Sequence, residues 1–196
     1  MRISDAAFCR RMSGLESAQP NPDNMTFYFM KAPDGSKPND GRHPVSLRSE
    51  QSGDEALLFA VFASTREEEL VPTNWPEPVR RSFLNQQFNA MRQGYQSMFP
   101  WGEFLIIELN GKPVGRMVLN RDNAEIRVVD LALLPAQRNM KIGTFLMRQI
   151  CADAKKPVRL SVLKNNRALH WYVRLGFVVT GERGFYEELE WRPLLT

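Results

Sequence analysis

The chain has 196 residues, 43% of them hydrophobic, which predicts one globular domain with a sizeable core and argues against two full domains. Its formal net charge of +4 comes from basic residues interspersed with acidic ones, which favours a small anionic partner over a nucleic acid. No apolar run approaches the ~18 residues of a membrane span, so we expect a cytoplasmic protein with no membrane partner.

Residues 1–43 differ from the rest of the chain. Four prolines interrupt this polar segment, and its only apolar run is MTFYFM, Met25–Met30. Because such a composition offers little surface to bury, we expect a flexible or partly ordered N-terminal extension. A start codon assigned too early is the alternative. Residues 44–196 are then the globular domain.

A short strand and two helices are predicted next. VSLR, which follows Pro44, has the composition of a strand, and Asp54–Leu70 repeats apolar residues at helical spacing. Three prolines then interrupt the chain. Pro78–Phe99 resumes the helical period, with Pro78 near the first turn, where a missing N–H costs little.

Three apolar runs between Glu103 and Pro135 predict an antiparallel meander. Asn110-Gly111 separates the first two runs, and this pair suits a type I′ turn, which needs positive φ at both central residues. Residues 120–123 supply the next turn. The third strand ends near Pro135.

A strand, a turn and a helix follow, and they suit an anion. The stretch QRNMKIGTFLMRQI, Gln137–Ile150, passes from a turn with one glycine, Gly143, into a helical pattern. The first N–H groups of a helix and its positive dipole end attract phosphate. Gly143 has no side chain to obstruct a phosphate, and Thr144 adds a hydroxyl. As an isolated signal, however, one glycine at such a turn is more often only a turn residue.

The remaining elements complete a mixed sheet. VRLSVL, Val158–Leu163, is a predicted strand, and NNRALHWYVRLG is a predicted helix with Asn165 or Asn166 as its N-cap and Gly176 after its end. FVVTGE and FYEELEW close the chain as two strands. The order β-α-α-β-β-β-α-β-α-β-β predicts an α/β sheet of mixed direction.

Two motifs in this order resemble the GNAT superfamily of acyl-CoA-dependent N-acyltransferases. The family signature combines [Q/R]-x-x-G-x-[G/A] after a strand with a later N-x-x-A-x-x-x-Y-x-x-x-G-F. The chain matches the second part at Asn165, Ala168, Tyr172, Gly176 and Phe177. It matches the first part at Arg138 and Gly143 and departs from it at Lys141. The resemblance covers roughly Val45 to Trp191.

This resemblance implies a fold and a cofactor site. The fold would be a GNAT-like mixed, mostly antiparallel twisted sheet flanked by helices and splayed between the fourth and fifth strands. The turn before the helix would bind the pyrophosphate of coenzyme A through backbone amides, and the fourth strand would bond the pantetheine arm like an added strand. The implied cofactor-binding residues are Leu131, Leu133, Arg138, Lys141, Ile142, Gly143, Thr144 and Asn165. No metal is implied.

Lys141 stands where a phosphate-binding turn of this kind more often has a second glycine. If the position needs positive φ, lysine carries a conformational cost that glycine would not. If φ is ordinary, the backbone N–H still serves and the ammonium attracts phosphate. We favour an ordinary φ, with Lys141 either a cofactor ligand or a solvated neighbour.

Proton transfer suggests the catalytic groups. An amine acceptor must lose a proton before it attacks the thioester, and the departing thiolate must be stabilised. By the resemblance Tyr172 faces the sulfur and is the general acid; the alternative is a core tyrosine. Asp130, a carboxylate in an otherwise apolar strand, is the chosen base, unless it merely pairs with Arg127 or an acceptor group. Glu125 is the reserve, more typical of a solvated strand end.

Other side chains receive structural assignments. The acceptor pocket should be built by the two N-terminal helices, with Gln87, Met91 and Tyr95 as candidates, although such a stripe is more often core. His170 should lie at the surface or a rim. The cysteines at positions 9 and 151 lie far apart and should be reduced thiols, the second of them in the core.

The function expected from the resemblance is transfer of an acetyl group from acetyl-CoA to a primary amine of a small molecule or peptide. The alternative is a non-catalytic acyl-CoA-binding or interaction module, in which the departure at Lys141 weakens the cofactor site. The acceptor, aminoglycosides and peptides included, and a homodimer are left open.

Overall fold

The computed structural model describes residues 45–193, and its elements follow the predicted order. They are β1 (Val45–Ser49), α2 (Glu55–Leu70), α3 (Glu77–Met98), β2 (Glu103–Leu109), β3 (Lys112–Arg121), β4 (Ile126–Leu133), α4 (Ile142–Asp153), β5 (Val158–Leu163), α5 (Ala168–Arg174), β6 (Val178–Arg183) and β7 (Tyr186–Trp191). The predicted N-terminal extension, with its MTFYFM segment and Cys9, lies outside the described residues.

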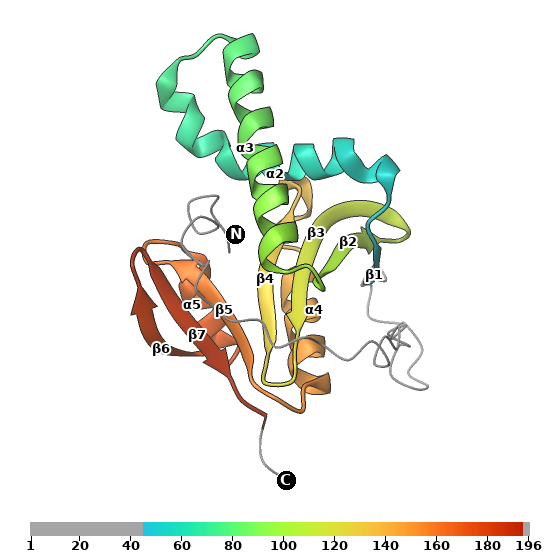
Figure 1. Ribbon diagram of the computed structural model, residues 1–196, viewed down its shortest axis with the longest axis vertical. Helices are drawn as coiled ribbons and strands as arrows, with labels where there is room; N and C mark the ends of the chain where they lie inside the picture. The colour runs from blue at the N-terminus through green and yellow to red at the C-terminus, as the bar shows by residue number, and fades with distance from the viewer. Residues whose placement is uncertain (1–44, 194–196) are drawn as a thin grey trace.

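The seven strands of the described residues form one sheet in the order β1-β2-β3-β4-β5-β7-β6. Neighbouring strands are antiparallel except β4 and β5, which pair in parallel only at Ile126 with Val158 and at Arg127 with Arg159. Beyond these two pairs the strands separate in the middle of the sheet (Figure 1). The predicted mixed, mostly antiparallel sheet with a splay between its fourth and fifth strands is confirmed.

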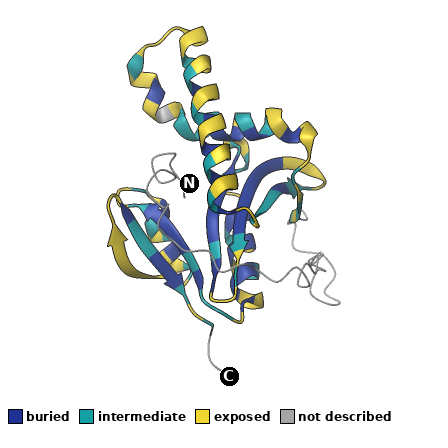
Figure 2. Ribbon diagram, in the orientation of Figure 1, coloured by how far each residue is buried: buried dark blue, intermediate teal, exposed yellow. Residues whose placement is uncertain are grey.

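Helices cover both faces of this sheet (Figure 1). On one face α2 and α3 bury apolar side chains such as Phe62 and Phe88 against Val118 of β3. On the other face α4 and α5 contribute Leu146 and Tyr172 to a second cluster. The central strands β3 and β4 are therefore buried between the layers, whereas β6 is exposed at the sheet edge (Figure 2).

The turn between β2 and β3 has the predicted conformation. Asn110 has φ 53° and Gly111 has φ 70°, which is the pair of positive values that a type I′ turn requires. Here a local sequence signal was sufficient, because glycine and asparagine tolerate left-handed φ better than other residues.

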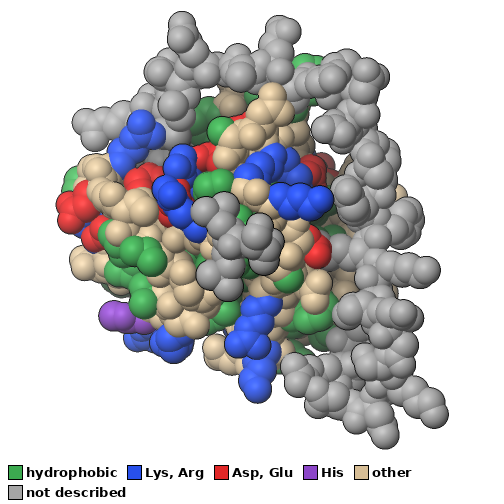
Figure 3. Space-filling model, turned by 90° about the horizontal axis from the view of Figure 1, so that it is seen from below, with side chains coloured by type: hydrophobic (Ala, Val, Ile, Leu, Met, Phe, Trp, Pro, Cys, Tyr) green, Lys and Arg blue, Asp and Glu red, His purple; other side chains and the backbone are tan. Residues whose placement is uncertain are grey.

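Charges are mixed on the surface as they are along the sequence. On the face that Figure 3 shows, Lys and Arg side chains lie among acidic and apolar ones and form no single continuous basic patch. No helix within residues 45–193 is both long and apolar enough to cross a membrane.

Candidate active site

The gap between β4 and β5 exposes one edge of β4. Within a strand, successive residues point their N–H and C=O groups to opposite neighbours. Leu134 N–H donates to Val114 O, on the β3 side, at 2.9 Å. Leu131 and Leu133 therefore direct their backbone groups toward β5, where pairing has already ended. This is the edge that, by the family resemblance, would bond an extended ligand.

The loop after β4 delivers the N-terminus of α4 to the end of this gap. Phe145 N–H donates to Lys141 O at 2.9 Å and starts the helical ladder, so the amides of Ile142, Gly143 and Thr144 have no intrahelical acceptor. These amides and the positive end of the helix dipole suit an anion.

Lys141 does not have the ordinary φ that we predicted. It is the N-cap of α4 with φ 61° and ψ 8°, in the left-handed region, and Asn139 in the same loop has φ 65°. The prediction was wrong because the path from β4 into α4 requires this conformation, whatever residue occupies it. The ammonium is on an exposed residue, whereas Ile142 and Gly143 are buried.

Arg138 shapes the loop rather than presenting free donors. Its backbone N–H donates to Pro135 O at 3.1 Å. Its guanidinium donates from Nε to Leu133 O at 3.1 Å and from Nη2 to Ser64 Oγ at 2.8 Å. Arg138 therefore ties the end of β4 to α2, and the amides open to a ligand begin further along the loop.

α5 is positioned by two side-chain hydrogen bonds. Trp171 Nε1 donates to Thr144 Oγ1 at 3.0 Å, which links α5 to the first turn of α4. Asn166 Oδ1 accepts from the backbone N–H of Ala168 at 2.9 Å, but the N-cap of α5 is Arg167, so neither of the predicted N-caps, Asn165 and Asn166, holds that position. Asn165 is exposed just before α5. The helix ends as predicted at Gly176, whose φ is 94°.

Tyr172 of α5 is fully buried. Its ring packs against those of Trp171 and Phe177, with centroids 4.5 and 5.6 Å away. Its hydroxyl has no hydrogen-bond partner. Burial, and then the negative charge of Asp130, raise the pKa of Tyr172 well above its ordinary value near 10. The hydroxyl is therefore protonated at neutral pH, a donor without an acceptor.

A β-bulge decides which way Asp130 points. Val128 and Asp130 face consecutive residues of β3, so Val129 is an extra residue in β4. Val128 and Leu131 belong to the core on the α4 side, and Val129 to the core under α2 and α3. The bulge thus interrupts the strict alternation and leaves Asp130 on the α2 and α3 face, where its partner lies.

That partner is Arg116 of β3. Arg116 Nε donates to Asp130 Oδ2 at 2.6 Å, and both side chains are more than nine-tenths buried. The sequence offered Arg127 as the partner, but three residues of strand separate Arg127 from Asp130 by about 10 Å. Sequence reasoning missed Arg116, although a charge inside the apolar run PVGRMVL is the same signal that singled out Asp130.

Glu125, the reserve base, is not a solvated strand-end residue as we predicted. It is 8% exposed and paired with Arg127 at 2.8 Å and with Arg159 at 2.7 Å. The strand end is buried because β5 and β7 continue the sheet beside it, and Arg159 of β5 bridges Glu125 to Glu190 of β7.

Two other side chains lie where we predicted. His170 is exposed. Cys151 is buried in the α4 core, and this burial raises the pKa of its thiol to about 12, which makes it unreactive at neutral pH. Among residues 45–193, no group of three or more His, Cys, Asp or Glu side chains comes together as a metal site.

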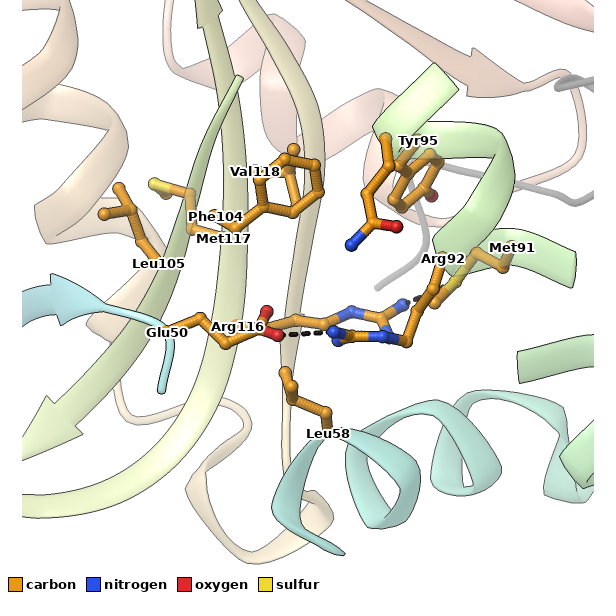
Figure 4. Close-up of a pocket in the computed structure, with 11 residues that line it drawn as sticks. Glu50, Leu58, Met91, Arg92, Tyr95, Phe104, Leu105, Arg116, Met117 and Val118 are labelled. Carbon is orange, nitrogen blue, oxygen red and sulfur yellow. Dashed lines mark hydrogen bonds and ion pairs between the residues drawn. The ribbon is translucent and has the colours of Figure 1, made fainter. Parts of the chain in front are cut away.

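A small pocket lies between the N-terminal helices and the sheet (Figure 4). Met91 and Tyr95 of α3, both predicted to line such a pocket, do so, but Gln87 is not in its wall. Leu58 of α2 and Arg116 of β3 also line it. The buried pair of Arg116 with Asp130 therefore borders the pocket.

The sequence matches the acetyltransferase (GNAT) family model over residues 63–177, more than half of the chain. Curated protein sequences give no match.

Solved structures share the fold. The PaiA N-acetyltransferase from Thermoplasma acidophilum, in complex with coenzyme A, superposes with a TM-score of 0.58 and 19% identity over 76% of this chain and 99% of its own. An acetyltransferase from Thermus thermophilus gives 0.56 and 17% identity over 78% of this chain and 99% of its own. A GNAT family acetyltransferase from Elizabethkingia anophelis, with acetyl-CoA bound, gives 0.51 and 15% identity over 76% and 98%. At these identities the likeness concerns the fold.

Proposed function

Because the chain belongs to the acetyltransferase (GNAT) family, we propose that it transfers an acetyl group from acetyl-CoA to a primary amine of a small molecule or peptide. The amine attacks the thioester directly, with Tyr172 as the general acid. The observation that carries this proposal is the separation of β4 from β5, which ends at the first amides of α4, amides that have no intrahelical acceptor.

The residues at the gap fit acetyl-CoA as the co-substrate. The amides of Ile142, Gly143 and Thr144 would hold the pyrophosphate, and the β4 edge that faces the gap would bond the pantetheine arm at Leu131 and at the N–H of Leu133, whose carbonyl already accepts from Arg138. Coenzyme A and acetyl-CoA are present in the solved structures from Thermoplasma acidophilum and Elizabethkingia anophelis, which supports this choice.

Tyr172 would stabilise the leaving thiolate. A hydroxyl buried without a partner gains more from a new charged acceptor than one already bonded to water. Complete proton transfer to a thiolate whose conjugate acid has a pKa of about 8.5 is uphill, because the pKa of Tyr172 is raised. The hydrogen bond from the Tyr172 hydroxyl to the developing thiolate therefore contributes most of the stabilisation. Transfer of the Tyr172 proton to the sulfur is completed when water enters the site.

Asp130 would take the proton from the amine, directly or through water. It lies on the face of the sheet that carries the pocket and is paired there with Arg116, which lines the pocket. Its pairing with Arg116 fixes the carboxylate in place. The base would then remove a proton from the attacking amine, and the acid would supply one to the leaving thiolate, as acetyl transfer from a thioester to an amine requires.

The test is Tyr172→Phe, which keeps the ring and removes the proton. We expect turnover, measured as coenzyme A release with a panel of primary amines, to fall about 10²–10⁴-fold while acetyl-CoA affinity stays near wild type. A fall of less than a few-fold would assign thiolate protonation to another group or to water. Acetyl-CoA binding by the wild type with no release for any amine would instead support the non-catalytic module.

A further inference from the structure

The pocket between α3 and the sheet has mostly apolar walls. Leu58, Phe104 and Val118 line it together with Met91 and the ring of Tyr95. Such walls suit an apolar side chain and offer few polar contacts to orient it. A ligand in this pocket would therefore be oriented by the small number of polar groups that border it.

Arg116 supplies one such group. Its Nε and Nη2 are engaged, by Asp130 Oδ2 at 2.6 Å and by Met91 Sδ at 3.2 Å. Its guanidinium carbon lies 5.9 Å from the centre of the Phe62 ring. The remaining nitrogen, Nη1, has no hydrogen-bond partner in the protein. It cannot be satisfied by bulk water either, because it is buried and the whole residue is only 5% exposed. A buried donor without an acceptor is costly, and a ligand oxygen would remove that cost.

The charges around the pocket balance. Arg116 faces Asp130, and Arg92 Nη2, also in the pocket wall, donates to Glu50 Oε1 at 2.6 Å. Figure 4 shows the Arg116 side chain extending from β3 toward α3, close to this second pair. Two arginines and two carboxylates leave no net charge for a ligand to neutralise. What remains unsatisfied is a hydrogen-bond donor.

The pocket also borders the proposed base, because Arg116, which lines it, is bonded to Asp130 Oδ2 at 2.6 Å. A ligand oxygen on Arg116 would therefore hold the acceptor next to that base.

We propose that this pocket binds the amine acceptor and that Arg116 Nη1 selects acceptors that carry a carbonyl or carboxylate oxygen near the amine, with an apolar side chain in the pocket. An α-amino amide, a peptide N-terminus or an α-amino acid has this chemistry. This inference rests on the proposed acetyl transfer, and Arg116 is its specificity-determining residue.

Three acceptors with the same side chain test it: 3-methylbutylamine, which has no oxygen, and leucinamide and leucine, which add a carboxamide and a carboxylate on the carbon that bears the amine. The variant is Arg116→Lys. Its single ammonium keeps a positive charge for Asp130 but lacks the second terminal nitrogen with which the guanidinium would also bond a ligand in the pocket. The matched control is Arg121→Lys, the same change further along β3, where Arg121 pairs with Glu103 at the surface. Thermal unfolding and acetyl-CoA affinity establish that each variant is folded.

We expect the ratio of kcat/KM for leucinamide or leucine over 3-methylbutylamine to fall about ten- to a hundredfold in Arg116→Lys, because one charged hydrogen bond is lost. The ratio should be unchanged in Arg121→Lys. Comparing ratios cancels the different pKa values of the three amines. Leucinamide and leucine, taken separately, distinguish an amide oxygen from a carboxylate. Equal ratios in the wild type and in Arg116→Lys would overturn the inference.

A binding measurement separates this inference from the proposed function. Calorimetry in the presence of coenzyme A compares the binding of N-acetylleucinamide and N-acetylleucine with that of N-(3-methylbutyl)acetamide. The measurement requires no turnover and is made on the wild-type protein. Tighter binding by the wild type of the two products that carry the additional carboxamide or carboxylate supports the inference even if no amine is acetylated, in which case the transfer proposal fails alone. Equal binding of all three, or no binding, overturns the inference and leaves the transfer proposal to the release assay.

Discussion

Two residues in the loop before α4, Asn139 and Lys141, adopt the left-handed conformation. Asparagine tolerates it, whereas for other residues with a Cβ it costs roughly 1–2 kcal/mol. Lys141 is exposed, and its ammonium has no packing role that would offset this cost. The loop therefore keeps a strained residue beside the amides proposed to bind phosphate.

We predict that Lys141→Gly raises the free energy of unfolding by about 1 kcal/mol, because glycine adopts positive φ without a steric penalty. Urea unfolding followed by circular dichroism measures the change. Asn139→Gly is the control in the same loop and should change stability much less. Equal effects of the two substitutions would contradict the assignment of strain to Lys141.

At the level of elements, β3 and β4 approach so closely at one point that only glycine fits. A Cβ placed on Gly115 would lie 2.4 Å from Ala132 O and 2.7 Å from Leu133 Cδ2. Gly115 is the β3 residue opposite Leu133, at the end of β4 that borders the gap. A side chain there would push β4 away from its neighbour.

Gly115→Ala should therefore lower the free energy of unfolding by about 1–3 kcal/mol, the usual cost of overpacking a well-filled region. Gly181→Ala in β6 is the matched control, since a Cβ there would have nothing within 4 Å. Thermal denaturation of both variants is the measurement. Similar melting temperatures for the two variants would contradict the prediction, because they would show that β4 shifts to admit the new Cβ with no loss of stability.

A partly buried ion pair fixes the start of α2 to the sheet. Arg48 of β1 donates to both oxygens of Asp54 at 2.7 Å and to Glu108 of β2 at 2.8 Å. The hydrogen bond from Arg48 is the largest cause that holds the pKa of Asp54 below its ordinary 3.8. The folded protein therefore binds this proton less readily than the unfolded chain does.

Asp54→Asn should lower the free energy of unfolding at pH 7 by about 1–3 kcal/mol, the usual worth of a hydrogen bond to a charged group. The contribution is present above the unfolded pKa and is lost as pH falls through the folded value, so the difference from wild type should shrink below about pH 4. Urea unfolding from pH 7 to pH 3 measures this. Glu103→Gln, in an exposed pair, is the control, and a difference independent of pH would refute the linkage.

For the whole molecule, two separate cores lie on opposite faces of one sheet, and the proposed site lies where that sheet divides. The described members of both cores come from residues 45–193, and the family match begins within α2, at residue 63. The elements that hold the site are therefore all inside the described part of the chain.

We predict that a chain starting at Gly41 folds and binds acetyl-CoA with the affinity of the full protein, because the site and both cores are retained. Melting temperature and calorimetric titration with acetyl-CoA are the measurements, with the full chain as the reference. Aggregation or lost affinity would assign residues 1–40 a part in the fold.

Local sequence preferences determined much of this protein. Periodicity, the Asn110-Gly111 turn and the glycine after α5 predicted every strand and helix in order, because each depends on residues a few positions apart. The two motifs, one with Arg138 and Gly143 and the other with Tyr172, identified the family for the same reason, since the residues within each motif stand at short, fixed spacings.

Only the tertiary structure decided which side chains meet at the site. The bulge at Val129 placed Asp130 beside Arg116, and the loop path imposed positive φ on Lys141. Arg138 bonds Ser64, 74 residues away in the chain. Strand register, helix packing and the dielectric of a buried site depend on the whole fold, so no short stretch of sequence encodes which charge pairs with which or which donor stays unsatisfied.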